Sequence, residues 1–110
     1  MRDKIIVEKM IQYSEKISEY VKGMDRDQFV SDSLVIDACV FNLSQIGELV
    51  GKISEDFENR NNDIRWRQIY GLRNRIVHDY EGVKFDLVWE IVSEDIPDLI
   101  EKLKAIEYYN

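Results

Sequence analysis

Hydrophobic residues recur at steps of three and four in several stretches of the chain, a pattern typical of amphipathic helices with one buried face. The first stretch, from about Asp3 to Lys22, is followed by Gly23, where a left-handed helix cap is expected. The polar segment after it predicts a loop, in which Ser31 or Asp32 would cap the next helix. The apolar stripe of the first helix comprises Ile6, Met10, Tyr13, Ile17 and Tyr20.

The second predicted helix, from about Leu34 to Ile53, is apolar over more than one face. So wide a surface predicts a central helix that contacts several neighbours. Gly47 within it costs about 1 kcal/mol relative to alanine, and we expect it to permit the close approach of another backbone. One face holds Val35, Cys39, Leu43, Ile46, Val50 and Ile53, and Leu34 and Phe41 widen it.

The segment EDFENRNND has no apolar stripe and predicts a loop or a frayed helix end. A third helix is expected from Asp63 or Ile64 to about Tyr80, with Trp66 anchoring its start. Its inner face comprises Ile69, Leu72 and Ile76.

The last predicted helix extends from Phe85 to Ile106 and has the most regular stripe, with Gly82 separating it from the helix before. Pro97 lies inside it and has no N–H, so the hydrogen bond to the Ser93 carbonyl is missing. A kink is therefore predicted at this point of the helix.

Together these stretches predict an all-α fold: a four-helix, mostly antiparallel bundle with a kinked last helix. A length of 110 residues suits one core, so residues 1–110 are expected to form a single domain. One Pro and five Gly are too few for an all-β chain with many tight turns.

Composition narrows the class of protein. Apolar residues make up 45% of the chain, which excludes a disordered tail. Charged and polar residues break the most apolar stretch, Leu34–Val50, and the N-terminus does not resemble a signal peptide, so a cytoplasmic protein without membrane contact is expected. A lone cysteine, Cys39, excludes an intramolecular disulfide and a zinc site built from paired cysteines.

The net charge of −7 conceals a local reversal. Residues 60–78 carry a charge of +4 and five of the seven arginines, whereas the rest of the chain carries −11. The guanidinium group presents a planar fork of donors that suits phosphate, which predicts a phosphate-binding segment. The alternative is that these arginines pair with acids on neighbouring helices. The five arginines are Arg60, Arg65, Arg67, Arg73 and Arg75.

His78, the only histidine, lies in the same segment. Imidazole titrates near neutral pH and can transfer a proton there. Arg73, Asn74 and Tyr80 beside it offer an anion stabiliser, an orienting amide and a phenol. One histidine without a patterned carboxylate cluster predicts no metal site, and no cofactor is expected. Alternatively, His78 is a histidine near a helix C-terminus that the helix dipole stabilises.

Helical geometry constrains any site built from these residues. At about 100° per residue, Asn74 and His78 share a face, whereas Arg73 and His78 point roughly 140° apart. Either the helix loosens near His78, or two chains assemble the site. RNA cleavage through the 2′-hydroxyl needs both a base and an acid, and a two-fold dimer would supply a second His78.

The stretch IRWRQIYGLRNRIVHDY and the following VWEIVSEDIPDLIEKL resemble the HEPN domains of the HepT toxin group. The signature of that group is Arg, four residues, His, one residue, Tyr, and it falls here on Arg73, His78 and Tyr80, with Asn74 as the polar residue after the arginine. QIGELVGKIS is similar to another segment of the group, so the likeness covers nearly the whole chain. One departure is Arg65, because these proteins commonly have proline before the tryptophan.

The resemblance implies a homodimeric, metal-independent endoribonuclease that acts as a toxin. His78 would transfer a proton, Arg73 would hold the scissile phosphate and Asn74 would orient them. Tyr80 would receive AMP from a partner, an MntA-type minimal nucleotidyltransferase antitoxin. The remaining phosphate contacts of the RNA substrate would come from Arg65, Arg67 and Arg75.

Two other functions stay open on the sequence alone. The chain could be a non-catalytic subunit that holds a nucleotide or substrate for a minimal nucleotidyltransferase. It could also be a helical dimerisation protein whose arginines form only salt bridges, in which case RNA binding that depends on salt is not expected.

Overall fold

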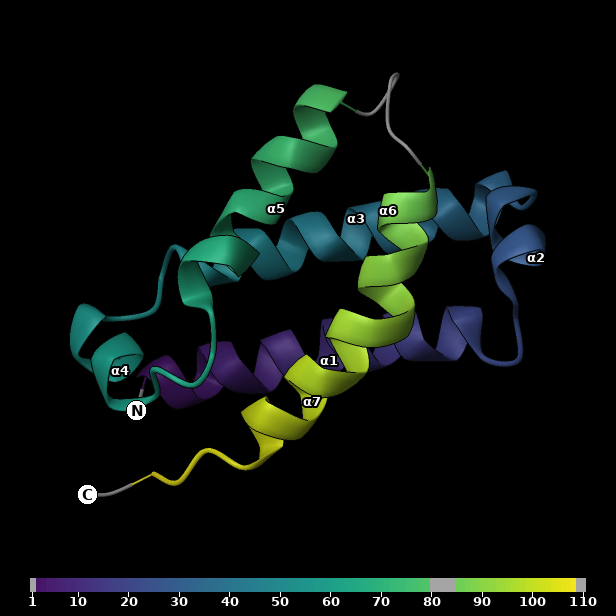
Figure 1. Cartoon of the computed structure of the whole chain (residues 1–110). Coiled ribbons are helices and arrows are strands. Elements are labelled where there is room, and N and C mark those ends of the chain that lie inside the picture. The colour runs from purple at the N-terminus through teal and green to yellow at the C-terminus, as the bar shows by residue number, and fades with distance from the viewer. Residues whose placement is uncertain (1, 80–84, 109–110) are drawn as a thin grey trace.

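The computed structural model describes residues 2–79 and 85–108, and no strand occurs among them. Its main elements are four long helical segments, with two short helices, α2 (Arg26–Val30) and α4 (Glu55–Arg60), in the connections between them (Figure 1). The prediction of an all-α, four-helix bundle is confirmed. The long segments are α1 (Arg2–Val21), α3 (Ser33–Val50), α5 (Trp66–Asp79), and a C-terminal run of α6 (Phe85–Glu90), η1 (Ile91–Asp95) and α7 (Ile96–Lys104).

The bundle is mostly antiparallel. Helix α3 runs back along α1 and also contacts α5, and α7 packs against α1 as well (Figure 1). Gly23 ends the first helix with a φ of +78°, as its position predicted. Asp32 caps α3 by accepting a hydrogen bond from the Val35 N–H at 3.1 Å. Helix α5 rises away from α3 toward its C-terminal end (Figure 1).

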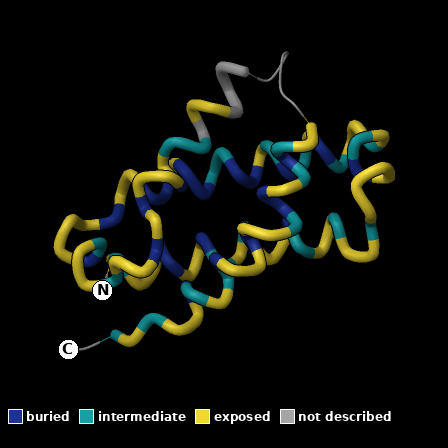
Figure 2. Tube along the Cα trace, viewed as in Figure 1, coloured by how far each residue is buried: buried dark blue, intermediate teal, exposed yellow. Residues whose placement is uncertain are grey.

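The core lies between the facing stripes of these helices (Figure 2). Met10 and Ile17 of α1 and Leu43 and Ile46 of α3 are fully buried, as the periodicity predicted. Tyr20 departs from the prediction, because it lies at the end of α1 and is 39% exposed.

Helix α3 contacts several neighbours, yet part of its wide apolar surface is not covered. Leu34 is 82% exposed and Phe41 is 59% exposed. They lie two turns apart on one side of α3, with half-buried Ala38 between them. The predicted contact of α3 with several neighbours is thus confirmed, but this side of the helix stays uncovered within the chain.

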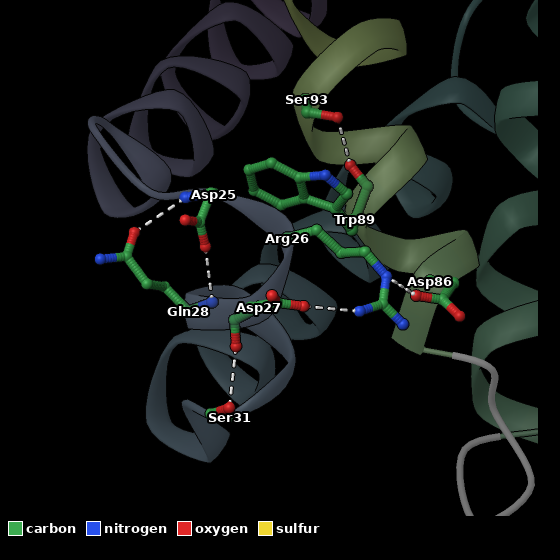
Figure 3. Close-up of polar contacts among 8 residues, drawn as sticks. All are labelled: Asp25, Arg26, Asp27, Gln28, Ser31, Asp86, Trp89 and Ser93. Carbon is green, nitrogen blue, oxygen red and sulfur yellow. Dashed lines mark hydrogen bonds and ion pairs between the residues drawn. The ribbon is translucent and has the colours of Figure 1, made fainter.

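The first connection, predicted as a loop, contains helix α2. A capping box starts it: the Asp25 carboxylate accepts from the Gln28 N–H at 2.8 Å, and the Gln28 side chain accepts from the Asp25 N–H at 2.9 Å (Figure 3). Buried Phe29 stabilises it by packing on the Trp89 ring at a centroid distance of 5.3 Å. One buried aromatic residue in a single turn produces no apolar stripe, which explains the missed helix.

Helix α2 is also joined to α6 by an ion pair. Arg26 donates from Nε to the Asp86 carboxylate at 2.5 Å and from Nη1 to Asp27 at 2.8 Å (Figure 3). These contacts connect the second element of the chain with the residues that begin the C-terminal segment.

The second polar connection is likewise a helix, α4, rather than a loop. Ser54 caps it by accepting from the Phe57 N–H at 3.3 Å. Asp3 of α1 accepts from both the Ser54 N–H, at 2.9 Å, and the Ser54 hydroxyl, at 2.8 Å. Phe57 is buried, so this short helix also rests on a single aromatic anchor.

The C-terminal segment is irregular immediately before Pro97, as predicted. Residues Ile91–Asp95 form a π-helical turn, and the Ile96 N–H bonds to the Ile91 carbonyl. Because proline has no N–H to donate, the wider turn takes up the interruption. In the same turn, the Ser93 hydroxyl donates a hydrogen bond to the Trp89 carbonyl at 2.6 Å.

Helix α3 is the one helix, among the residues described, that is long and apolar enough to cross a membrane by length and composition. A central helix of a bundle passes the same test. Here α3 contacts both α1 and α5, and it carries Asp37 and Glu48 on its exposed side.

Candidate functional site on α5

Helix α5 carries five of the predicted site residues, and Trp66 fixes where it begins. Arg65 directly precedes the helix. The indole N–H donates to the Asn61 carbonyl at 3.0 Å, and the ring packs edge-on against Phe57 at 6.1 Å. The helix starts at Trp66 rather than at the predicted Asp63 or Ile64, because the Ile64 N–H bonds back to Asn61 in a turn. Trp66 thus anchors the helix start, as predicted.

One side of α5 lies over the C-terminal part of α3. Tyr70 and Asn74, one turn apart, face Glu48 and Lys52 across a pocket of about 220 Å³. Gly47 and Gly51 of α3 complete its wall. Asn74, a predicted site residue, is exposed at this pocket. The pocket brings together an amide, a phenol, a carboxylate and an ammonium group.

Glycine at position 51 permits this arrangement. A Cβ built there would lie 3.0 Å from Cε2 of the Tyr70 ring, closer than real Cβ contacts allow without a shift. Gly47 is buried in the same stretch of α3. The close contact found here is at Gly51 and is made by a tyrosine ring, whereas the close approach of another backbone at Gly47 stays a prediction.

The opposite side of α5 borders a larger groove, of about 730 Å³, against α6, η1 and α7. Arg65 and Arg75 lie on its α5 wall, and both are exposed. Glu90, Asp95 and Asp98 lie on the facing wall, and its apolar lining includes Leu72 and Leu87. Lys102 also lines the groove, with its Nζ 3.1 Å from Asp98 Oδ2, so the two arginines face a wall that carries three acids and one lysine.

The predicted arginine cluster is consequently divided between two sides of the helix. Arg67 does not line this groove; its Nε lies 3.7 Å from Glu58 Oε1, and its side chain is 78% exposed. Arg60 lies over the Phe57 ring at 5.8 Å. An exposed ion pair at this distance contributes little stability, so Arg67 keeps most of its capacity to bind an anion.

The motif residues lie at the C-terminal end of α5. The helix is regular through Asp79, so Arg73 and His78 belong to one uninterrupted helical backbone. Of the two alternatives drawn from the sequence, the backbone up to Asp79 therefore does not support a helix that loosens at His78. The side chains of Arg73 and His78, and the whole of Tyr80, lie outside the described residues.

Catalysis by a thiol or at a metal site finds no support in the residues described. Burial raises the pKa of the Cys39 thiol to about 12, so this residue is a buried, inert thiol, as its place on the apolar stripe predicted. Among the side chains that the structure describes, which do not include that of His78, no three His, Cys, Asp or Glu gather as a metal site would require.

Sequence reasoning missed three residues at the pocket: Glu48, Lys52 and Tyr70. The available signal was the four-residue step from Gly47 to Gly51, matched by the four-residue step from Tyr70 to Asn74. Small residues at such a step allow a neighbouring helix to pack closely, and the polar residues next to them then border the contact.

Comparison with known proteins identifies the family of this chain. The family described as "Ribonuclease HepT-like" matches residues 10–106. A protein of Caldanaerobacter subterraneus subsp. tengcongensis, named "Putative RNase TTE0752", is 33% identical over 91% of this chain and 89% of its own length. The "Probable ribonuclease HepT" of Thermococcus cleftensis is 30% identical over 91% of each chain. No solved structure matches the chain. The protein belongs to the HepT-like ribonuclease family.

Proposed function

We propose that this protein is a metal-independent endoribonuclease, the toxin of a toxin–antitoxin pair, whose active site two copies of the chain build together. Family membership and the names of its relatives support the ribonuclease activity. The observation that carries the two-chain site is the regular helix through Asp79, because it keeps positions 73 and 78 on divergent sides of α5.

The chemistry is a transesterification. A base removes the proton of the 2′-hydroxyl, whose oxygen attacks the phosphorus while the bond to the 5′-oxygen breaks. An acid protonates that leaving oxygen, and the products are a 2′,3′-cyclic phosphate and a 5′-hydroxyl. His78 transfers protons in this scheme, Arg73 stabilises the charge on the phosphate and Asn74 orients the reacting groups.

A homodimer supplies what one chain lacks. In a two-fold assembly, His78 of one copy can approach Arg73 of the other, so that each of the two sites contains one Arg73 and one His78 from different chains. The exposed apolar side of α3, with Leu34 and Phe41, offers a surface for such contact beside the helix that carries the motif.

Phosphates flanking the scissile bond would contact the remaining arginines. Arg67 is exposed and has one weak ionic partner, whereas Arg65 and Arg75 face acids across the larger groove. We expect Arg67 to contribute the most to RNA affinity, because Arg65 and Arg75 have acids near them in the groove.

Neutralisation would act on the residue next to the site. In this proposal a minimal nucleotidyltransferase antitoxin transfers AMP to Tyr80: the phenol oxygen attacks the α-phosphate of ATP and pyrophosphate leaves. The added phosphate places negative charge beside Arg73 and occupies the space meant for RNA phosphate. Mass spectrometry of the protein expressed together with such a partner would show AMP on the peptide that contains Tyr80.

A cleavage assay tests the activity. Wild-type protein with EDTA present should cut a labelled RNA and leave 2′,3′-cyclic phosphate ends, and His78→Ala should lose both cleavage and growth arrest with its fold intact by circular dichroism. Arg73→Ala should fail in the same way. Arg2→Ala, which removes an exposed arginine at the start of α1, is the matched control and should cleave normally. Wild-type protein that does not cleave RNA would instead favour a non-catalytic nucleotide-binding subunit, and full activity of His78→Ala would contradict the role given to His78.

A further inference from the structure

Tyr70 is an aromatic residue that stays open to solvent on the helix that carries the motif. We infer that its ring stacks on an unpaired base of the RNA, which makes single-stranded RNA the substrate class. The inference rests on the proposed ribonuclease function, because that function brings RNA to this helix. Stacking needs an open ring, a ring that is held in place and a nearby cation for the adjoining phosphate.

The ring is open although it takes part in helix packing. Tyr70 is 46% exposed, whereas three aromatic residues that fill the core, Phe29, Phe57 and Trp66, are at most 4% exposed. Phe57 and Trp66 use their surface on each other, with ring centroids 6.1 Å apart. Nearly half of the Tyr70 surface is thus available to a ligand.

Gly51 of α3 holds the ring in place. A Cβ at position 51 would lie 3.0 Å from Cε2 and 3.6 Å from Cδ2 of Tyr70, so one edge of the ring rests against the glycine. A side chain that packing has already fixed loses little conformational entropy when a ligand binds to it. The contact with Gly51 therefore prepares Tyr70 for stacking.

Arg67 supplies the cation for the backbone beside that base. It precedes Tyr70 by three positions, which places the two residues next to each other on one side of α5. The Arg67 side chain is 78% exposed, and its ionic contact is long, with Nε 3.7 Å from Glu58 Oε1. A guanidinium group this accessible can bind a phosphate through paired hydrogen bonds. Tyr70 and Arg67 thus offer one contact for a base and one for the backbone next to it.

The location of the ring relates it to the motif. Tyr70 and Asn74, one turn apart, border the same pocket between α3 and α5. Position 78 lies on this side of α5 too, about 12 Å farther along the helix axis than Tyr70. A base on Tyr70 therefore belongs to a nucleotide close to the scissile phosphate but outside the reacting groups.

Stacking selects single strands rather than a sequence. In an RNA duplex the bases are paired and stacked on one another, whereas an unpaired base can turn its face toward an aromatic side chain. Every base has such a face, so stacking adds affinity with little preference among bases. The inference accordingly assigns a substrate class and no recognition sequence.

Binding of two oligonucleotides to the full-length His78→Ala protein, which cannot cleave them under the proposed function, tests the inference. One is a fluorescein-labelled decamer of uridine, and the other is an abasic decamer with the same label and charge. Fluorescence anisotropy at low salt gives both affinities. Adding Tyr70→Leu should weaken binding of the uridine decamer at least about fivefold and leave binding of the abasic decamer unchanged. Tyr70→Phe keeps the ring and should keep the difference between the two decamers.

Matched controls separate stacking from charge and from a general effect of losing a tyrosine. Tyr20→Leu removes a tyrosine that is 39% exposed at the end of α1, and it should change neither affinity. Arg67→Ala should weaken both decamers alike and lower the slope of log affinity against log salt by about 0.7–1. Arg2→Ala, which removes an exposed arginine at the start of α1, should change neither affinity nor slope.

Equal losses for the two decamers in Tyr70→Leu would overturn the inference. So would a guanosine–cytidine RNA duplex whose binding depends on Tyr70, or a Tyr70→Leu protein that light scattering shows to be smaller than its parent, since Tyr70 would then be a subunit contact. If wild-type protein cuts single-stranded and duplex RNA equally well, the inference fails and the proposed function stands. If the decamers behave as expected and wild-type protein cuts no RNA, the reverse holds.

Discussion

Tyr70 of α5 lies against Gly51 of α3, with Cε2 of its ring 3.0 Å from where a Cβ at position 51 would be. This contact sets how α5 crosses α3 and holds Asn74 beside Glu48 at the same pocket. One glycine thus links the packing of the bundle to the residues that we assign to RNA.

Gly51→Ala should therefore displace the Tyr70 ring. The backbone at position 51 is ordinary right-handed helix, so alanine is tolerated there, and the free energy of unfolding should change by less than about 1 kcal/mol. RNA affinity should fall, because Asn74 borders the same pocket as the displaced ring. Gly71→Ala is the control: a Cβ there meets nothing within 4 Å, so it should stabilise α5 by about 0.5–1 kcal/mol and leave RNA affinity unchanged. Urea denaturation and fluorescence anisotropy measure the two quantities, and unaltered RNA binding by Gly51→Ala would contradict this account.

The uncovered side of α3 predicts where the two chains of the proposed dimer meet. Phe41→Glu introduces a charge where Phe41 is 59% exposed and should convert the dimer into a monomer without unfolding the chain. Ile5→Glu on α1 is the matched control, because Ile5 is similarly exposed, at 54%. This substitution should leave the dimer intact. Light scattering coupled to size-exclusion chromatography gives the mass. A Phe41→Glu protein that remains dimeric would place the contact elsewhere.

The ion pair between Arg26 and Asp86 predicts a stability effect that depends on pH. The hydrogen bond from Arg26 lowers the pKa of the Asp86 carboxyl below its ordinary value. A lowered pKa in the folded state gives a contribution that is present above the unfolded pKa and is lost as pH falls through the folded one. Asp86→Asn should thus lower the melting temperature slightly at pH 7 and have no effect in strong acid. High salt should reduce the difference, because both groups are exposed. An Asp86→Asn effect that is equal at every pH would exclude the ion pair as its cause.

Cys39 should behave as a buried thiol with no part in catalysis. Since burial raises its pKa to about 12, iodoacetamide at pH 8 should modify it about a thousandfold more slowly than an ordinary thiol, and unfolding in urea should restore the normal rate. Cys39→Ala should cleave RNA as the wild type does. Rapid modification of the folded protein, followed by mass spectrometry, would show that the thiol is accessible.

The long helices could be predicted from the sequence, and the two short ones could not. In α1 and α3 the apolar residues repeat over several turns and identify the buried side directly. Helices α2 and α4 each bury one aromatic residue, Phe29 and Phe57, which gives no repeat. Their start signals were present as Asp25 with Gln28 and as Ser54, but such caps also occur in loops without helices.

The candidate site could likewise be predicted from the sequence only in part. The signature on α5 is readable in the sequence, because its residues are spaced along one helix. Glu48 and Lys52 reach the site only through the way α3 and α5 cross, and the place of that crossing depends on packing at Gly51. The separation of Arg65 and Arg75 from Arg67 likewise follows from which sides of α5 meet neighbouring helices.

Mixing two inactive variants tests the two-chain active site most directly. Arg73→Ala and His78→Ala proteins are unfolded together, refolded as a mixture and assayed for RNA cleavage, with each variant refolded alone as the control. If Arg73 of one chain works with His78 of the other, half of the dimers are mixed and each of these holds one intact site, so about a quarter of wild-type activity should return. A mixture as inactive as its two components would contradict a site that is shared between chains.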